Sequence, residues 1–372
     1  MSRELGVRRL VALPYARAMG VYVAIRLLTL VVVALANLST HHGWVSDLST
    51  WDGAWYLRAV YHGWPSHLTY VNGRVTGSPI AFFPLFPLVI RALAYLSGLG
   101  AATVGILVSG LTGLAAVYLI GALTRHLADA ERAERAALLF AVSPGSFVFS
   151  LIYAEGTVLI FMILGLIALL QRRWVLAGAL GALASITSPV GLAFAAACAV
   201  TSVAAIARQR EWRSLVAPIL APVGFVAWML YLWRHTGTIM AWRLTERDGW
   251  NSYPSLAYPV RILTKFLFNP LSPTMTGQML FWCTVVAIAL TVLTFRERQP
   301  LPVLAYGVSA VVLFAISSPV GLRPRFLMLA FPLTIAAATH FEGRRFRAVL
   351  AISTIALTLM TVETLTSWAV FP

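Results

Sequence analysis

Two carboxylates attract attention because acidic residues are few: Asp and Glu number 13, against 28 Lys and Arg. Asp52 lies in the segment WDGAWY (residues 51–56), and Glu155 lies in YAEG (residues 153–156). A carboxylate can take a proton from an attacking hydroxyl, so Asp52 is a candidate general base and Glu155 a second acidic site residue. Asp52 also has a structural reading, as the N-cap of a helix that begins near Gly53. For Glu155 the alternative is a structural hydrogen-bonding role.

Two arginines near the other end of the chain suit a phosphate. Arg323 and Arg325 lie in GLRPRF (residues 321–326), just before a late apolar run. A guanidinium group matches phosphate with two parallel hydrogen bonds and stays charged at any physiological pH. The alternative is that both side chains extend to lipid headgroups. Arg26 and Arg91 lie inside apolar runs and require partners, either a carboxylate or a lipid phosphate.

The segment around Asp52 offers further substrate-binding candidates but no metal site. These candidates are Trp51, Tyr56, Arg58 and His42. His41 and His42 are adjacent, so their rings point in different directions, and the spacing typical of zinc ligands is missing. P-loop, dinucleotide and serine-hydrolase motifs are also missing from the sequence. We therefore expect neither a metal nor an organic cofactor.

The elements that carry these residues belong to a membrane protein. The 372 residues are 59% apolar and only 11% charged, with a mean hydropathy of +0.82. Soluble chains average about 25% charged residues. The net charge of +15 comes largely from arginines in short breaks between apolar runs, at 172–173, 208–213, 296–298 and 344–347. Such clusters mark cytoplasmic loops and argue against a nucleic-acid partner.

The apolar runs predict a single all-α transmembrane domain over 1–372, a bundle of about 11–12 spans. Two polar stretches, 39–78 and 234–278, are too long for turns and are rich in Trp and Tyr. We expect them to be external loops with interfacial helices along the membrane surface. The predicted runs are 17–38, 79–97, 101–123, 136–152, 155–170, 174–187, 189–206, 215–233, 279–295, 301–317, 326–340 and 347–367.

Orientation contains one conflict. A basic N-terminus followed by an uncleaved first span places 39–78 outside. Counting membrane crossings backward from the arginine clusters, taken as cytoplasmic, disagrees with this placement by one crossing. The disagreement lies between residues 79 and 152. Either FFPLFP (residues 82–87) or SPG (residues 143–145) marks a re-entrant segment.

Several motifs together resemble one family. WDGAWY, then HGW (62–64) and FFPLFPL (82–88), are similar to the glycosylphosphatidylinositol mannosyltransferase II family and its bacterial relatives. YAE (153–155), RRW (172–174), TSPVG (187–191), PRF (324–326) and FP (331–332) follow in the family's order. The resemblance covers residues 20 to 340. The chain departs from the family pattern at Ser188, where Arg is common, and at Ala154, where Thr is usual.

The resemblance implies a GT-C glycosyltransferase, most simply a mannosyltransferase that inverts the anomeric centre. It implies a polyprenyl-phosphate sugar as donor, a glycolipid or glycan as acceptor, and membrane lipids as surroundings. The catalytic acid of such enzymes lies in the first large external loop, where Asp52 lies. The expected location is a bacterial cell membrane, crossed many times, with the active site on the extracytoplasmic side. The alternative function is a lipid or solute transporter with Arg26 and Arg91 on its path.

Overall fold

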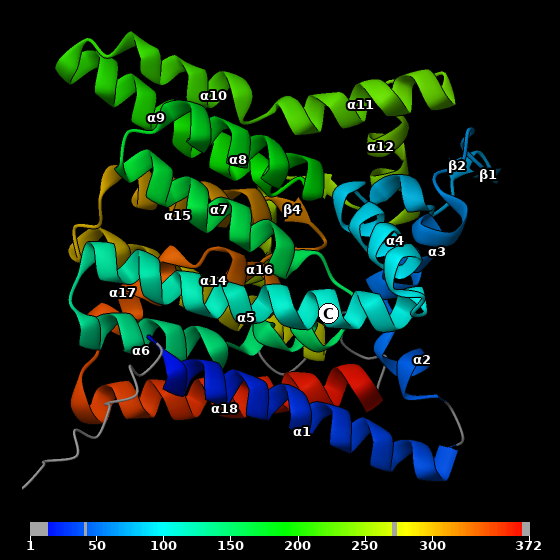
Figure 1. Ribbon diagram of the computed structural model, residues 1–372, viewed down its shortest axis with the longest axis horizontal. Helices are drawn as coiled ribbons and strands as arrows, with labels where there is room; N and C mark the ends of the chain where they lie inside the picture. Colours follow the sequence, from blue (N-terminus) through cyan, green and yellow to red (C-terminus); the bar gives the residue numbers. More distant parts are fainter. Residues whose placement is uncertain (1–13, 41–42, 270–273, 367–372) are drawn as a thin grey trace, which may run out of the picture.

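The computed structural model describes residues 14–40, 43–269 and 274–366, and they are overwhelmingly helical (Figure 1). The elements up to residue 209 are α1 (Ala16–Thr40), α2 (Trp44–Leu48), α3 (Asp52–His62), β1 (Tyr70–Val71), β2 (Arg74–Val75), η1 (Pro79–Ala81), α4 (Leu85–Ser97), α5 (Ala101–Leu127), α6 (Ala130–Ala141), η2 (Pro144–Ser150), α7 (Glu155–Leu170), α8 (Trp174–Thr187) and α9 (Gly191–Gln209).

The second half continues the same pattern after one long polar stretch. Its elements are η3 (Trp212–Leu215), α10 (Val216–Leu220), α11 (Val223–Thr236), α12 (Ala241–Leu244), η4 (Thr245–Gly249), β3 (Tyr253–Pro254), α13 (Tyr258–Phe268), α14 (Met275–Arg296), α15 (Leu301–Ala315), β4 (Ser317–Ser318), α16 (Pro324–Leu329), α17 (Pro332–His340) and α18 (Gly343–Thr366). The strands are two short antiparallel pairs. Tyr70 is opposite Val75 in β1–β2, and Tyr253 is opposite Ser318 in β3–β4.

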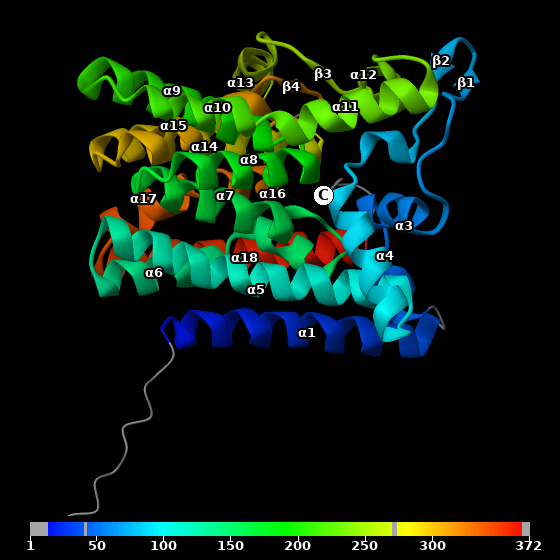
Figure 2. The same cartoon turned by 45° about the horizontal axis from the view of Figure 1, so that its top comes forward.

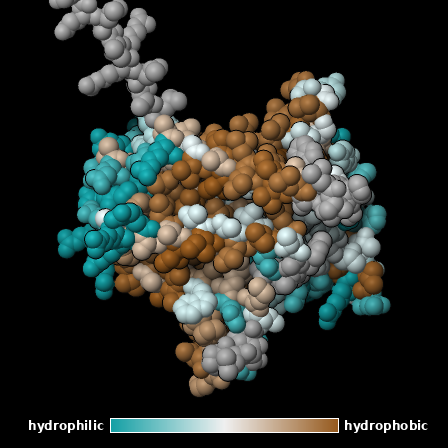
Figure 3. Space-filling view, turned by 90° about the horizontal axis from the view of Figure 1, so that it is seen from below, coloured by the Kyte–Doolittle hydropathy of each residue, from teal (hydrophilic) through white to brown (hydrophobic). Residues whose placement is uncertain are grey.

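The long helices confirm the predicted all-α membrane bundle. Among the described residues, six helices are long and apolar enough to cross a membrane, or up to seven if the bent pair η2–α7 is one span. Other predicted spans correspond to shorter or broken helices, which depend on their neighbours to satisfy the backbone. Side chains such as Leu28 on α1 and Ile352 on α18 are exposed. Figure 3 shows a broad apolar surface on one face of the molecule, with hydrophilic residues gathered at one end of it.

Two glycines on α5 fix how α1 lies against it. A Cβ on Gly121 would lie 2.8 Å from the Tyr15 ring, and one on Gly113 would lie 2.6 Å from Phe149 and collide with the Tyr22 hydroxyl. Tyr15, just before α1, thus meets the later glycine of α5, and Tyr22 within α1 meets the earlier one, so the two helices are antiparallel. Each crosses the bundle once, as Figure 1 shows.

Helix α4 accounts for the orientation conflict. It lies at the end of the bundle that holds α2 and α3, and it runs across the direction of α5 (Figure 2). Near its C-terminus Tyr95 is 88% exposed and Leu96 is 77% exposed. The predicted span 79–97 is wrong because the segment begins and ends on one side of the bundle. Removing this crossing makes the two counts agree, and it leaves Arg91 exposed at that end.

At the second candidate segment, Ser143-Pro144-Gly145, the chain passes from α6 into the short helix η2. A sharp bend follows after η2, where the axes of η2 and α7 differ by 118°. Buried Arg26 on α1 donates hydrogen bonds to the Ser146 carbonyl (2.5 Å) and the Ser150 hydroxyl (3.0 Å). Within the part of the chain that the structure describes, the partner of this intramembrane arginine is thus the irregular segment η2, and the expectation of a carboxylate is wrong.

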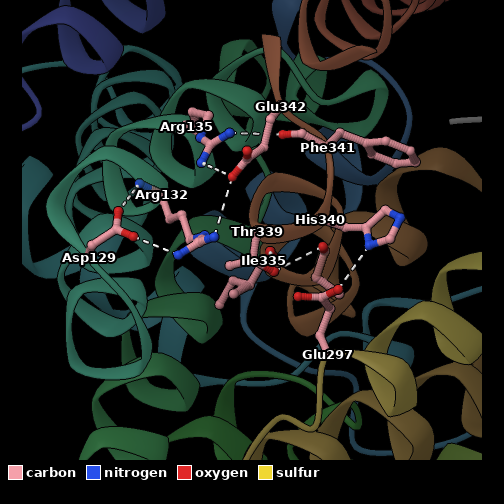
Figure 4. Close-up of polar contacts among 10 residues, drawn as sticks. Asp129, Arg132, Arg135, Glu297, Ile335, Thr339, His340, Phe341 and Glu342 are labelled. Atoms are coloured by element: carbon pink, nitrogen blue, oxygen red, sulfur yellow. Dashed lines mark hydrogen bonds and ion pairs between the residues drawn. The ribbon is translucent and has the colours of Figure 1, made fainter.

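The arginine-rich turns gather at the end of the bundle away from α3 and α4 (Figure 1). Ion pairs link several of them, as Figure 4 shows. Glu342 lies 3.3 Å from both Arg132 and Arg135, and the His340 ring lies 2.9 Å from Glu297. These contacts tie the α5–α6, α14–α15 and α17–α18 turns together.

Candidate active site

Three charged side chains from distant parts of the sequence meet at the end opposite the arginine-rich turns. Arg325 Nη1 lies 2.5 Å from Asp52 Oδ2 and 3.6 Å from Glu155 Oε1. The side chains of Arg325 and Glu155 are almost buried, at 12% and 11% exposed, whereas that of Asp52 is 26% exposed. Headgroup contact as an explanation of Arg325 is therefore wrong.

Asp52 occupies the first turn of α3, but it does not cap the helix. Trp51 is the N-cap residue and no side chain caps the helix, so the N-cap reading of Asp52 is wrong. Trp51 has φ 59° and ψ −127°, a conformation that a non-glycine residue rarely adopts. The Gly53 amide closes this turn on the Thr50 carbonyl at 3.0 Å. The turn leaves the Asp52 carboxylate free to face Arg325.

Close backbone contact positions Arg325. A Cβ on Gly145 of η2 would collide with the Pro324 carbonyl oxygen and lie 2.7 Å from the Arg325 Cα. The Arg325 guanidinium carbon lies 5.2 Å from the centre of the Tyr153 ring and 4.4 Å from that of Phe326. Burial lowers the pKa of Arg325, but Asp52, Tyr153 and Glu155 outweigh it and raise the pKa. Arg325 is therefore a fixed cation.

Glu155 begins α7, directly after the irregular stretch that follows η2. A carboxylate in the first turn of a helix is favoured by the partial positive charge of the free amides there. Arg325, at the start of the short helix α16, has the opposite sign and gains nothing from that position. Its charge is instead balanced by the two carboxylates, so the three residues depend on one another.

Asp52 and Arg325 line both of two cavities. The smaller, of about 430 Å³, also holds Glu155, and the larger has a volume of about 1090 Å³. Trp250 lines both as well. Its ring fills the space that a Cβ on Gly77 would need, the nearest ring atom being 2.5 Å away. Asp52, Arg325 and Trp250 thus lie where the two cavities adjoin.

Basic side chains line the larger cavity. They are Arg323, which precedes α16, and Arg261 and Lys265 of α13. Burial and the neighbouring Arg325 lower the pKa of Arg323 to about 10, so it keeps its charge at neutral pH. Other residues of α13 are exposed and apolar, among them Val260 and Phe268. A helix with cations on one face and exposed apolar side chains on another is typical of a membrane interface.

Acidic, hydroxylic and aromatic groups line the smaller cavity. Glu246 of η4 is there with Glu155, and burial together with Asp52 raises the pKa of Glu246 to about 7. Thr187 and Ser188 add hydroxyls, and Trp242 adds an indole ring. Tyr56 also lines this cavity, and burial raises its pKa well above the usual value.

The other predicted site residues divide into three groups. Trp51 and Arg323 line the larger cavity, and Tyr56 lines the smaller. Arg58 is exposed, lines neither cavity, and lies 4.3 Å above the Trp55 ring. His42 lies outside the described residues. Within those residues, His, Cys, Asp and Glu form no group of three or more placed to hold a metal ion.

Sequence reasoning missed Glu246, Arg261 and Lys265. The run RLTERDGW (243–250) alternates cations and acids, which gives it the pattern of an ordinary solvated loop. The usable signal was that Arg261 and Lys265 are four residues apart and so share one helix face. Glu246 had no such signal, because only the folded loop carries it to Asp52.

Comparison with known structures shows the fold. ArnT from Cupriavidus metallidurans bound to undecaprenyl phosphate is 18% identical, with a TM-score of 0.52 over 91% of this chain and 64% of ArnT. The apo form of ArnT gives 16% identity and a TM-score of 0.51, over 83% of this chain and 56% of ArnT. This chain thus spans less than two thirds of ArnT. The architecture is that of GT-C glycosyltransferases.

Comparison of the sequence with families gives a closer relationship. No curated protein shows a significant sequence match. The family model described as mannosyltransferase (PIG-V) matches residues 22–216, which is more than half of the chain and includes Asp52 and Glu155. The chain therefore belongs to the PIG-V mannosyltransferase family.

Proposed function

We propose that this membrane glycosyltransferase moves a mannosyl group from a polyprenyl-phosphate sugar to an acceptor hydroxyl, with Asp52 as the base. The observation that carries the proposal is the contact between Asp52 and Arg325 where the two cavities adjoin. Family membership supports mannose as the sugar. The ArnT structure with undecaprenyl phosphate shows that this fold accommodates a lipid phosphate, which supports the class of donor.

In the proposed reaction each charged group has one role. As the bond between the anomeric carbon and the phosphate oxygen breaks, the acceptor oxygen bonds to that carbon and its proton passes to Asp52. The phosphate leaves with additional negative charge, which the fixed guanidinium of Arg325 stabilises. Attack from the side opposite the phosphate inverts the anomeric centre. Glu155 helps to hold Arg325 in place.

The ion pair suggests an order of binding. Asp52 is held by Arg325 at 2.5 Å. A donor phosphate near Arg325 would compete for the guanidinium and leave the Asp52 carboxylate free to accept a hydrogen bond from the acceptor hydroxyl. Donor binding then precedes proton removal, which also limits transfer of the sugar to water.

The larger cavity is the natural place for the donor. It contains Arg261, Lys265 and Arg323, and α13 exposes apolar residues beside it. A lipid phosphate needs cations for its headgroup and an opening toward the bilayer for its chain. The sugar phosphate is already activated, so we expect neither a nucleotide nor a metal, and transfer in excess chelator should proceed at the usual rate.

Charge distribution supports an extracytoplasmic site. The arginine-rich turns lie at one end of the bundle, and α3, whose first residue is Asp52, lies at the other (Figure 1). Positive residues near spans favour the cytoplasmic side. We therefore place the site on the outer face of a cell membrane. The transporter alternative loses its basis, since Arg26 binds the η2 backbone and Arg91 is exposed on α4.

The decisive experiment measures transfer of labelled mannose from polyprenyl-phosphate mannose by purified protein in vesicles. Asp52→Asn should reduce the rate by about 10²–10⁴-fold, because the proton acceptor is lost. Binding of the donor lipid should remain within a few-fold. Asp47→Asn, the same change in nearby α2 and outside both cavities, is the matched control. Full activity of Asp52→Asn, or movement of unmodified lipid without transfer, would overturn the proposal.

A further inference from the structure

Glu246 is held firmly although it belongs to a long loop. The Ser252 amide donates to its carbonyl oxygen at 2.8 Å, which closes the loop behind it. Two residues later, the Asp248 carboxylate accepts a hydrogen bond from the Val75 amide at 3.3 Å. A Cβ on Gly249 would lie 2.7 Å from the Gly77 amide nitrogen, so the loop presses against the β1–β2 segment. The second long loop is thus fixed to the first.

The smaller cavity has the composition of a sugar site. Its volume of about 430 Å³ falls in the lower part of the range for small-molecule pockets. Trp242 and Trp250 offer flat apolar rings, which suit the C–H face of a pyranose. Glu246 and the hydroxyls of Thr187 and Ser188 offer hydrogen bonds to ring hydroxyl groups.

The two cavities differ in charge, and that difference separates their ligands. Among the groups that line one cavity alone, the larger has three cations, Arg261, Lys265 and Arg323, against one carboxylate, Asp248. The smaller has two carboxylates, Glu155 and Glu246, against two cations, Arg243 and Arg247, so its charges balance. The excess positive charge favours a phosphate in the larger cavity. An uncharged carbohydrate in the smaller one would find both acceptors and donors for its hydroxyls. Because Asp52 lines both cavities, a hydroxyl that arrives from the smaller one reaches the proposed base.

We propose that the smaller cavity binds the acceptor as an uncharged sugar residue, and that Glu246 is its specificity-determining residue, hydrogen-bonded to acceptor hydroxyls. The inference rests on the proposed function and extends it, since it names a glycan in place of a peptide hydroxyl or a simple lipid alcohol. Asp52 removes the proton, and Glu246 selects and orients the molecule that supplies it.

The test separates acceptor binding from donor binding and from chemistry. Octyl α-mannoside is the acceptor probe, and polyprenyl phosphate without sugar is the donor-site probe. Glu246→Gln should raise the acceptor KM by about 10-fold or more, as expected when a hydrogen bond to a charged group is weakened. The rate at saturating acceptor should change by less than about 5-fold, and the Kd of polyprenyl phosphate should be unchanged.

Two comparisons make the result specific. Glu131→Gln, the same substitution at an exposed residue of α6, should behave like the wild type. Equilibrium binding of labelled octyl mannoside, measured without donor, should weaken in Glu246→Gln by the same factor as KM.

The outcomes distinguish this inference from the proposed function. A rise in donor Kd in Glu246→Gln, with acceptor binding unaltered, would overturn the inference and assign Glu246 to the donor. Equal transfer to a serine peptide and to the mannoside would also overturn it. If the wild type binds both probes but transfers no sugar, the proposed function fails, whereas the effect of Glu246→Gln on mannoside binding still decides this inference.

Discussion

The two ends of the bundle use the same kinds of charge in opposite ways. At the arginine-rich end Glu342 pairs with Arg132 and Arg135, and its side chain is 60% exposed. At the other end Arg325 pairs with Asp52 and Glu155, and its side chain is 12% exposed. Water and salt screen the first group, whereas the protein shields the second from both. Substitutions in the exposed group should therefore change stability and activity little. Substitutions in the buried group should change activity strongly.

The largest contrast should come from the two arginine clusters. Arg325→Gln removes the cation from two carboxylates and from the leaving phosphate, so we expect transfer to fall by about 10²–10³-fold. Arg132→Gln, the same change at the exposed end, should leave the rate within about 2-fold. Rates of mannosyl transfer at saturating donor measure both. Similar losses in the two variants would abolish the distinction between the ends.

A smaller effect should follow from moving Arg325 without removing it. A side chain on Gly145 would press on the backbone at Pro324 and Arg325, so Gly145→Ala should lower the transfer rate by about 10-fold or more. The matched control is Gly110→Ala, because the added Cβ there meets only the Phe149 carbonyl, at 3.8 Å. An unchanged rate in Gly145→Ala would show that the contact does not set the position of the guanidinium.

The raised pKa of Glu246 predicts a pH effect at the site end. With a pKa near 7, Glu246 gains its charge as pH rises from 6 to 8. The acceptor KM should therefore fall over this interval in the wild type and stay flat in Glu246→Gln. The charged and titratable groups that share its cavity are Asp52, Tyr56, Glu155, Arg243, Arg247, Tyr253 and Arg325.

The same shift has a consequence for folding. The folded-state pKa of about 7 lies above the usual 4.5, so the folded protein holds this proton more tightly than the unfolded chain. The proton bound to Glu246 stabilises the folded protein fully below pH 4.5, and this stabilisation is lost as pH rises through 7. At pH 8, Glu246→Gln should thus unfold at a temperature at least as high as the wild type. A lower temperature would mean that the carboxylate has a structural role.

The smallest effect belongs to the exposed end. Glu342→Gln should reduce the free energy of unfolding by about 1 kcal/mol or less, because exposed ion pairs contribute little. Raising the salt concentration should reduce the difference from the wild type further. A thermal shift measured at low and high salt checks this. A large loss that persists in high salt would show that the turns behave as a buried network.

The membrane bundle and three of its charged site residues could be predicted from the sequence. Composition reveals apolar helices directly, and scarce acids near an interface mark Asp52 and Glu155. The direction of α4 could not be predicted, because an apolar run of its length reads as a span whichever way it lies. Arg58 was also a predicted substrate-binding residue, whereas its side chain stacks on the Trp55 ring and lines neither cavity.

Long-range contacts explain what was missed. Glu246 reaches the site because Gly77, Gly249 and Trp250 let the two long loops fit together. Arg26 was correctly judged to need a partner, but that partner is a carbonyl exposed by the break at Pro144. Neither contact leaves a periodic pattern in the sequence, because each depends on how segments far apart in the chain meet in the folded protein.

The indole of Trp250 has a consequence for product release. It lines both cavities, as do Asp52 and Arg325. Under the proposed function, the polyprenyl phosphate would leave from the larger cavity and the mannosylated acceptor from the smaller. The two products could then dissociate independently, and the slower dissociation would limit turnover.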